Sequence, residues 1–188
     1  MIPCSCKKEF ISNNKNNFSN CDKFKEGLDE EYEKKLERLR KKVADSFNIN
    51  IEDENEIPAC NIYRGKLYSQ LDDSFWDELK NTDKKEVCIV NPLYGLIHWF
   101  EPITSHDLTM EDNIGKNRLN TWWKHNNLSE FLTNHIEKND FDLVRSLLPV
   151  SHKKAMPFIQ YNLDIEWLQY DYPQLRSGSN YYRGWDLS

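Results

Sequence analysis

The most regular hydrophobic pattern in the chain predicts an amphipathic helix over residues 29–47. Apolar residues recur there at spacings of three and four, which places them on one helix face; they are Tyr32, Leu36, Leu39, Val43 and Phe47. Asp29 is a suitable N-cap residue, and acidic residues follow it at the positive end of the helix dipole. Basic residues lie toward the other end, where they could bind phosphate, although dipole complementarity and solvation explain them without a ligand; they are Arg38, Arg40, Lys41 and Lys42.

A second pattern predicts a buried strand that begins at Val87. Val87-Cys88-Ile89-Val90 is a short apolar, β-branched run. Pro92 cannot donate to a strand ladder, so the strand should end there, and Gly95 allows a sharp turn or a close approach. Residues 101–110 follow as a polar loop. Because ligands of α/β proteins usually bind beyond the carboxyl ends of buried strands, we expect a pocket here.

Helix and strand patterns alternate along the rest of the chain. We expect a short first strand within residues 1–6, a helix over 73–79, two helical pieces within 113–139 and a parallel strand over 143–150. Residues 59–71 are apolar and β-branched before Gly65 and helical in character after it. Residues 11–28 resemble a polar loop, and the aromatic-rich segment 157–188 has no clear pattern. The alternation predicts an α/β fold, a three-layer αβα sandwich with a mainly parallel sheet, as one domain over 1–188.

Composition narrows the functional classes. The chain has 188 residues, and aromatic residues make up 13% of it, which offsets a modest hydrophobic content of 38% and argues against disorder throughout. The net charge of −6 argues against a protein that coats nucleic acid through a uniformly basic surface. Residues 1–50 nevertheless hold 11 Lys or Arg against 9 Asp or Glu. Phosphate contacts would therefore depend on local basic groups.

The cysteine content and the N-terminal sequence predict a cytoplasmic protein that does not enter a membrane. Met1-Ile2-Pro3-Cys4 has neither the basic nor the apolar region of a signal peptide. No apolar run approaches the roughly 20 residues that cross a bilayer. Five cysteines are an odd number, which fits free thiols in a reducing compartment; they are Cys4, Cys6, Cys21, Cys60 and Cys88.

The first candidate for chemistry is the segment from Pro3 to Phe10. Ser5 and Lys8, just past a predicted strand, could hold a phosphate or an oxyanion. A thiol next to lysines has a lowered pKa and could act as a nucleophile, although an exposed basic terminus explains the segment equally. Cys4-x-Cys6 together with Cys21 could supply three metal ligands, but the spacing is not that of paired CxxC motifs. We expect neither a metal nor a cofactor.

Three further groups have polar or aromatic chemistry. His106-Asp107, near Tyr94-Gly95, could hydrogen-bond a heterocycle or transfer a proton, or could be loop residues without a task. Ser151-His152-Lys153-Lys154 is a basic patch suited to backbone phosphates, or a helix start with solvated lysines. Trp122-Trp123 could stack on bases, but adjacent aromatic residues on a helix face different ways, so at least one should belong to the core.

Several short motifs follow one another in a fixed order. They are Pro3-Cys4-Ser5-x-x-Lys8, Tyr63-x-Gly65, Leu93-Tyr94-Gly95-Leu96, Pro102 and His106-Asp107-Leu108-Thr109. Their order resembles the YaaA superfamily, over about residues 1–156. This group includes peroxide-stress proteins and a domain of archaeosine synthase. The resemblance implies a uracil-DNA-glycosylase-like αβα sandwich. It also implies DNA binding with protection from oxidative damage, or modification of a deazaguanine base in tRNA or DNA.

The resemblance also implies roles for individual residues. Ser5 and Lys8 would meet an anionic or polar group of the ligand, while Tyr63, Tyr94 and Gly95 would line the base-binding pocket. His106 and Asp107 would form the polar edge that reads or activates the heterocycle. From the residues themselves we expect Cys4, His106 and Asp107 to be catalytic, with Cys4 or Asp107 acting on the base and His106 moving the proton. The basic patch likewise leads us to expect that Lys153 and Lys154 contact the nucleic-acid backbone.

We therefore expect a protein that binds, and as an enzyme modifies, a deazaguanine-type or damaged nucleobase in DNA or tRNA. Two alternatives stay open. One is a non-catalytic DNA-binding protein that protects DNA under stress. The other is an enzyme whose partner is a small molecule, a free nucleobase or nucleotide, and not a nucleic acid. A steep fall of affinity with salt would favour DNA binding without base preference.

Overall fold

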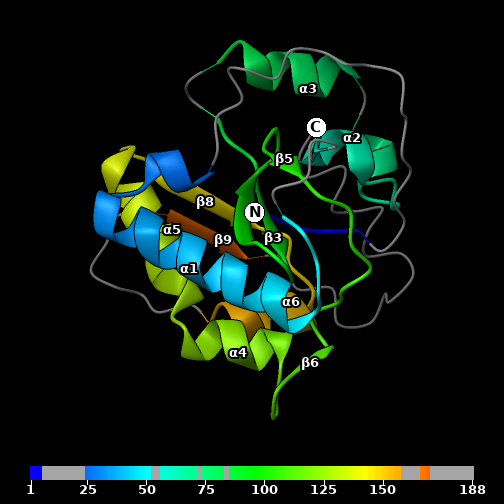
Figure 1. The fold of residues 1–188 in the computed structure, drawn as a ribbon. Helices are drawn as coiled ribbons and strands as arrows, with labels where there is room; N and C mark the ends of the chain where they lie inside the picture. Colours follow the sequence, from blue (N-terminus) through cyan, green and yellow to red (C-terminus); the bar gives the residue numbers. More distant parts are fainter. Residues whose placement is uncertain (6–23, 52–55, 72, 83–84, 158–165, 170–188) are drawn as a thin grey trace.

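The fold is that of a computed structural model, which describes residues 1–5, 24–51, 56–71, 73–82, 85–157 and 166–169 (Figure 1). It is an α/β structure, as the sequence pattern predicts. The helices are α1 (Glu30–Ser46), α2 (Ala59–Ile62), α3 (Asp73–Lys80), α4 (Leu119–His125), α5 (Leu128–Lys138) and α6 (Val150–Ala155), with 3₁₀ helices η1 (Phe24–Gly27) and η2 (Tyr68–Gln70). The strands are β1 (Ile2–Pro3), β2 (Ile57–Pro58), β3 (Cys88–Asn91), β4 (Gly95–His98), β5 (Pro102–Ile103), β6 (Asn113–Ile114), β7 (Asn117–Arg118), β8 (Leu143–Ser146) and β9 (Glu166–Gln169).

Some predicted features lie outside the described residues. They are Lys8, Cys6 and Cys21, most of the predicted loop 11–28 and most of the segment 157–188. Within the described part of the chain, no helix has the length and apolar character needed to cross a bilayer.

The described strands form four small sheets, and the three-stranded one, in the order β1-β3-β4, is mixed and has the buried strand β3 at its centre. β1 runs parallel to β3, with Ile2 opposite Ile89, and β4 returns antiparallel as a hairpin. β8 and β9 form a second parallel pair. The Met1 nitrogen donates to the Arg145 carbonyl and the Leu147 amide donates to the Met1 carbonyl, so the end of β8 lies beside β1. Antiparallel pairs β2–β5 and β6–β7 complete the described sheets.

The β3–β4 hairpin depends on Gly95. Asn91 pairs with Gly95, which leaves Pro92, Leu93 and Tyr94 as a three-residue turn. Such turns require a residue in the left-handed conformation after them, and Gly95 has φ +75°. A Cβ on Gly95 would also lie 2.9 Å from the Trp123 ring, so α4 packs directly on this glycine.

We expect Gly95→Ala to lower the free energy of unfolding by about 2–4 kcal/mol, because left-handed backbone strain adds to overpacking. Gly115 has φ +60°, but a Cβ added there would meet nothing within 4 Å. Gly115→Ala is therefore a matched control that isolates the strain, with an expected cost of about 1–2 kcal/mol. Urea unfolding of both variants measures the difference, and equal costs would contradict the packing on Trp123.

The predicted helices are present, but the range predicted as helical from residue 113 is wrong at its start: residues 113–118 form the antiparallel strands β6 and β7, and α4 begins at Leu119. α1 covers the predicted range, and the break between α4 and α5 falls at the predicted asparagines, with Asn127 at φ 59°. The Asp29 carboxylate does not cap α1 but accepts a hydrogen bond from Asn134 Nδ2 at 2.6 Å, which joins α1 to α5. The strand predicted over 143–150 ends at Ser146, because Pro149 and Val150 begin α6.

Several of the chain's aromatic residues lie in the core. Trp122 and Trp123 are both buried, and Trp123 Nε1 donates to the Pro92 carbonyl at 2.8 Å. This pair therefore belongs to the core and is not a base-stacking surface. On α3, Leu79 is buried whereas Phe75 and Trp76 are half-buried. The segment before Gly65 forms the short helix α2, and η2 follows it.

Candidate functional site

The carboxyl ends of β1 and β3 bring Cys4 beside Asn91. Pro3 pairs with Val90, and the Cys4 amide donates to the Val90 carbonyl at 3.1 Å, so the register continues toward Cys4 and Asn91. Because the two strands are parallel, both chain segments leave the sheet at the same edge. This edge is where ligand sites of α/β proteins form.

Asn91 is the centre of a buried hydrogen-bond network. Its Nδ2 donates to the Tyr63 hydroxyl at 2.6 Å and lies 3.2 Å from His106 Nε2. Its Oδ1 accepts the amides of Leu93 and Tyr94 at 2.7 and 2.9 Å. One side chain thus fixes the turn after β3 and joins two of the residues singled out by sequence. The sequence gives no sign of this role, because an asparagine before a proline has the pattern of an ordinary turn residue.

Cys4 lies close enough to Tyr63 for the two to interact electrostatically. Burial raises the pKa of the Tyr63 phenol well above its usual value of 10.0, and charge on Cys4 raises it further. The hydrogen bond to Asn91 lowers the pKa of Tyr63 but does not reverse the shift. Tyr63 therefore stays protonated at physiological pH.

The segment between α2 and η2 holds the N-terminal segment in place. A Cβ at Gly65 would lie 2.3 Å from Ser5 Oγ, so only glycine allows Ser5 this approach. The Tyr68 hydroxyl donates to the Pro3 carbonyl at 2.9 Å. The motifs around Ser5 and Gly65, far apart in the chain, thus belong to one site.

Cys4 also has a histidine partner on α6. Its Sγ lies 3.5 Å from His152 Nε2, and Ser151 Oγ lies 3.2 Å from His152 Nδ1. Cys4, Ser151 and His152 are all half-buried. An imidazole beside a thiol can accept its proton and so produce a nucleophilic thiolate. The sequence places His152 only in a basic patch, because nothing local indicates a partner 148 residues away.

The remaining predicted site residues differ in their positions. Tyr94 is nearly fully buried, its hydroxyl accepts the Thr104 amide at 2.9 Å, and its ring centre lies 6.4 Å from that of His106. Gly95 packs on α4 as described above. Asp107 is exposed beside the buried His106. Tyr94 and His106 therefore lie within the network around Asn91, whereas Asp107 reaches the surface next to it.

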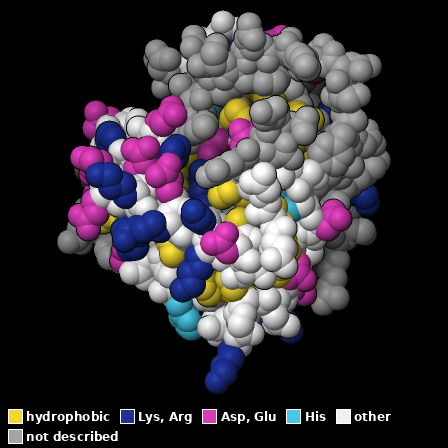
Figure 2. Space-filling view, in the orientation of Figure 1, with side chains coloured by type: hydrophobic (Ala, Val, Ile, Leu, Met, Phe, Trp, Pro, Cys, Tyr) yellow, Lys and Arg dark blue, Asp and Glu magenta, His cyan; other side chains and the backbone are white. Residues whose placement is uncertain are grey.

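The basic residues of α6 and α1 differ in their neighbours, and so in how well they are suited to contact phosphate. Lys153 and Lys154 follow His152 on α6, half-buried and exposed respectively. On the face seen in Figure 2, lysine and arginine side chains over α1 alternate with acidic ones. Arg40 is not part of that surface, since it is buried and paired with Glu101 at 2.7 Å. The lysines of α6 therefore adjoin the histidine partner of Cys4, whereas the basic groups of α1 are balanced by acidic neighbours.

Comparison with known proteins identifies the family. The family model described as peroxide stress protein YaaA matches residues 5–181. The chain belongs to this family. No curated protein and no solved structure matches it. Membership of the YaaA family supports a stress-related role, and the matched range includes Tyr63, Asn91, His106 and His152.

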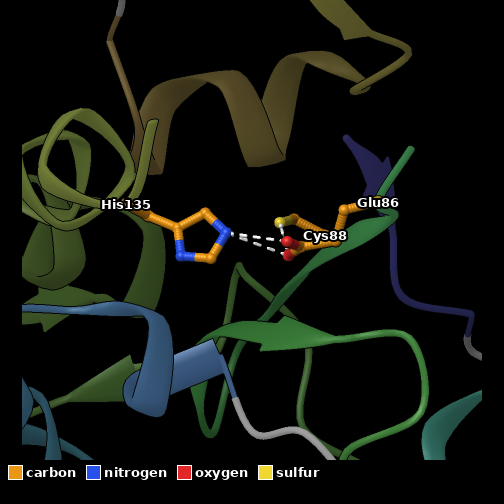
Figure 3. Close-up of side chains that lie close together, drawn as sticks. All are labelled: Glu86, Cys88 and His135. Carbon is orange, nitrogen blue, oxygen red and sulfur yellow. Dashed lines mark hydrogen bonds and ion pairs between the residues drawn. The ribbon is translucent and has the colours of Figure 1, made fainter. Parts of the chain in front are cut away.

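A second polar cluster of this YaaA-family chain lies at the opposite end of β3. Glu86 and Cys88 come from the start of the strand, and His135 points toward them from α5 (Figure 3). The Cys88 thiol donates to Glu86 Oε1 at 3.0 Å, and His135 Nε2 lies 2.9 Å from Glu86 Oε2. Burial raises the pKa of the Cys88 thiol well above its usual value of 9.0. The sequence does not reveal this cluster, because its members have the patterns of separate core or helix-face residues.

The Glu86 carboxyl has a lowered pKa, although burial acts to raise it, because His135 donates a hydrogen bond and contributes positive charge. A folded-state pKa below the usual 4.5 stabilises the folded protein above that pH, and the contribution disappears as the pH falls through the folded value. We therefore expect the unfolding free energy of wild type to fall more steeply below about pH 4.5 than that of Glu86→Gln. The exposed Glu111 supplies the control, Glu111→Gln, which should retain the wild-type slope in urea titrations at successive pH values.

Proposed function

We propose that this YaaA-family protein binds a nucleobase of a nucleic acid at the shared edge of β1 and β3 and modifies it. The observation that carries this proposal is the distance of 3.5 Å between Cys4 Sγ and His152 Nε2, beside the network of Asn91. A nucleophile and a base at hydrogen-bonding distance are the first requirement of covalent catalysis. The family's stress-related role is consistent with chemistry on damaged or modified bases.

The residues around this pair have complementary roles in the proposal. His106 and Tyr94 supply hydrogen-bonding and aromatic groups, which an extruded base requires. Asp107, at the surface beside His106, takes part in activating the base. Ser5 contacts a polar group of the ligand. Lys153 and Lys154, which follow His152 on α6, contact backbone phosphates of the nucleic acid.

The proposal includes the finer architecture of the fold. We propose that β1, β3, β8 and β9 belong to one parallel core sheet, with β4 as an antiparallel neighbour of β3, within a three-layer αβα sandwich of the uracil-DNA-glycosylase type. The parallel pairs β1–β3 and β8–β9, and the hydrogen bonds of Met1 with Arg145 and Leu147, support this arrangement. A fold of that type presents the carboxyl ends of its strands to the ligand.

Mass spectrometry of total nucleosides tests the proposed chemistry. Cells that express wild type should differ by at least one nucleoside from cells without the protein, and Cys4→Ala should abolish that difference. Cys60→Ala, at a buried cysteine on α2, and His125→Gln, at an exposed histidine on α4, should retain it. Identical nucleoside profiles with and without the protein would contradict base modification.

A second candidate is non-catalytic binding of DNA that protects it under stress. The position of Lys153 and Lys154 on α6 favours it, because backbone contacts need no catalytic group. Binding measured over a salt series separates the two functions. A steep salt dependence without base preference, together with unchanged nucleosides, would favour this candidate. Tight binding of a free nucleobase without polymer binding would favour the third function, a small-molecule enzyme.

A further inference from the structure

The cluster at the start of β3 has three side chains of the kinds that bind transition metals. A carboxylate oxygen of Glu86, Cys88 Sγ and a ring nitrogen of His135 all lie within 4.8 Å of one another. Cys88 and His135 are buried, and Glu86 is half-buried. Thiolate, imidazole and carboxylate together are ligands that zinc accepts.

Two of the distances between these ligand atoms are close to those around a tetrahedrally coordinated zinc ion. Zinc bonds of about 2.0–2.3 Å at tetrahedral angles place neighbouring ligand atoms roughly 3.4–3.6 Å apart. His135 Nε2 and Cys88 Sγ each lie 3.0 Å from the same oxygen, Glu86 Oε1, and the ligand atoms of Cys88 and His135 lie within 4.8 Å of each other. On binding an ion, the two shorter distances would each lengthen by roughly half an ångström.

The His135 ring is fixed in its orientation by its surroundings. Its centre lies 4.4 Å from that of Phe24 and 5.9 Å from that of Phe141. A Cβ on Gly27 would lie 2.5 Å from ring atoms, so η1 also packs on the ring. Asn139 lies 3.4 Å from His135 Nδ1, where its amide can position the nitrogen that faces away from Glu86.

A pocket of about 260 Å³ adjoins the cluster. Glu86 and His135 line it directly, and His98, which pairs with Cys88 across the hairpin, lines it as well. A metal bound by three protein ligands would thus have an open side toward a space large enough for water or a small anion. Three protein ligands and an open fourth position are typical of catalytic zinc sites.

We propose that Glu86, Cys88 and His135 bind one zinc ion whose fourth position faces this pocket. Binding releases the thiol proton of Cys88 and requires His135 Nε2 to coordinate without its proton, so affinity rises with pH. The site lies at the opposite end of the four-residue strand β3 from Asn91. It is therefore separate from the proposed base site, and either proposal can fail without the other.

Titration of the full chain with zinc tests the site, with Co²⁺ as a spectroscopic probe. Wild type should bind one equivalent of zinc, gain thermal stability on binding, and show thiolate-to-metal charge transfer with Co²⁺. Cys88→Ser and His135→Gln each remove a direct ligand, so they should weaken zinc binding by more than the roughly 100-fold that loss of an outer-shell partner costs. Cys4→Ser, Cys60→Ser and His125→Gln should bind zinc as wild type does.

The thiolate-to-Co²⁺ charge-transfer band, measured in the Cys4→Ser variant, tests the site even if His135→Gln does not fold. Its presence there would show that a thiol other than Cys4 holds the ion, and its loss in the double variant Cys4→Ser/Cys88→Ser would assign it to Cys88. Loss of zinc binding in Cys4→Ser with retention in Cys88→Ser would overturn the proposal, as would an absence of stoichiometric binding by wild type.

Discussion

Glu101→Ala is expected to lower the free energy of unfolding by about 3–5 kcal/mol, because it leaves the buried charge of Arg40 without its partner. The side chains of Arg40 and Glu101 are only 7% and 3% exposed, and their charged atoms lie 2.7 Å apart. Arg40 also donates to the carbonyls of Tyr94 and Leu96, while Glu101 accepts the amides of Phe24 and His98. The pair therefore connects α1, η1 and both ends of β4.

Two further variants decide whether burial is the cause of this effect. Asp77→Ala removes an exposed ion pair with Lys80 on α3 and should cost less than about 1 kcal/mol. The double variant Arg40→Met/Glu101→Leu removes both charges, but four backbone groups lose their partners, so we expect only partial recovery relative to Glu101→Ala. Urea unfolding measures all three. A cost for Glu101→Ala no larger than for Asp77→Ala would contradict the buried pair.

Asn91→Leu is expected to cost at least about 3 kcal/mol of unfolding free energy and to abolish ligand binding at the shared edge of β1 and β3. The substitution leaves the amides of Leu93 and Tyr94 and the hydroxyl of Tyr63 without a partner in a buried environment, at about 1–3 kcal/mol for each unsatisfied group. It also removes the contact of Asn91 Nδ2 with His106 Nε2. Both effects follow from one side chain that is fully buried.

Asn126→Ala is the matched control for Asn91→Leu. Asn126 is half-buried, and its Nδ2 donates to the single carbonyl of Trp122 at 2.7 Å, so its loss should cost about 1 kcal/mol. Urea unfolding measures the loss of stability in both variants. Nucleic-acid affinity, measured at a temperature where both variants are folded, measures the loss of binding separately. Wild-type affinity in folded Asn91→Leu would remove Asn91 from the site.

Local patterns in the sequence predicted the elements but not all of their packing. The helix over 29–47 was predictable because its apolar spacing is regular. The basic run predicts that Arg40 is solvated or binds phosphate, yet it lies four residues after Leu36 and three before Val43, on the buried stripe itself. That spacing indicates burial of Arg40, but the sequence does not show that its partner is Glu101, which lies after β4.

The candidate site was predictable where motifs follow strand ends. Segments after β1 and β3 meet because parallel strands place their carboxyl ends at one edge, which the alternation of elements already suggested. His152 and the cluster around Cys88 could not be found in this way, since each contact joins residues from elements far apart in the chain. Tertiary packing alone brings α6 to Cys4 and α5 to Cys88.

Peptide mass spectrometry of iodoacetamide alkylation at pH 7 measures how fast Cys4 reacts, and so tests whether Cys4 and His152 form a reactive site that binds nucleic acid. We expect His152→Gln to slow alkylation of Cys4 by about tenfold or more, since the imidazole no longer supports the thiolate. We also expect saturating cellular DNA or tRNA to protect Cys4 in wild type. An alkylation rate that neither His152→Gln nor nucleic acid changes would contradict such a site.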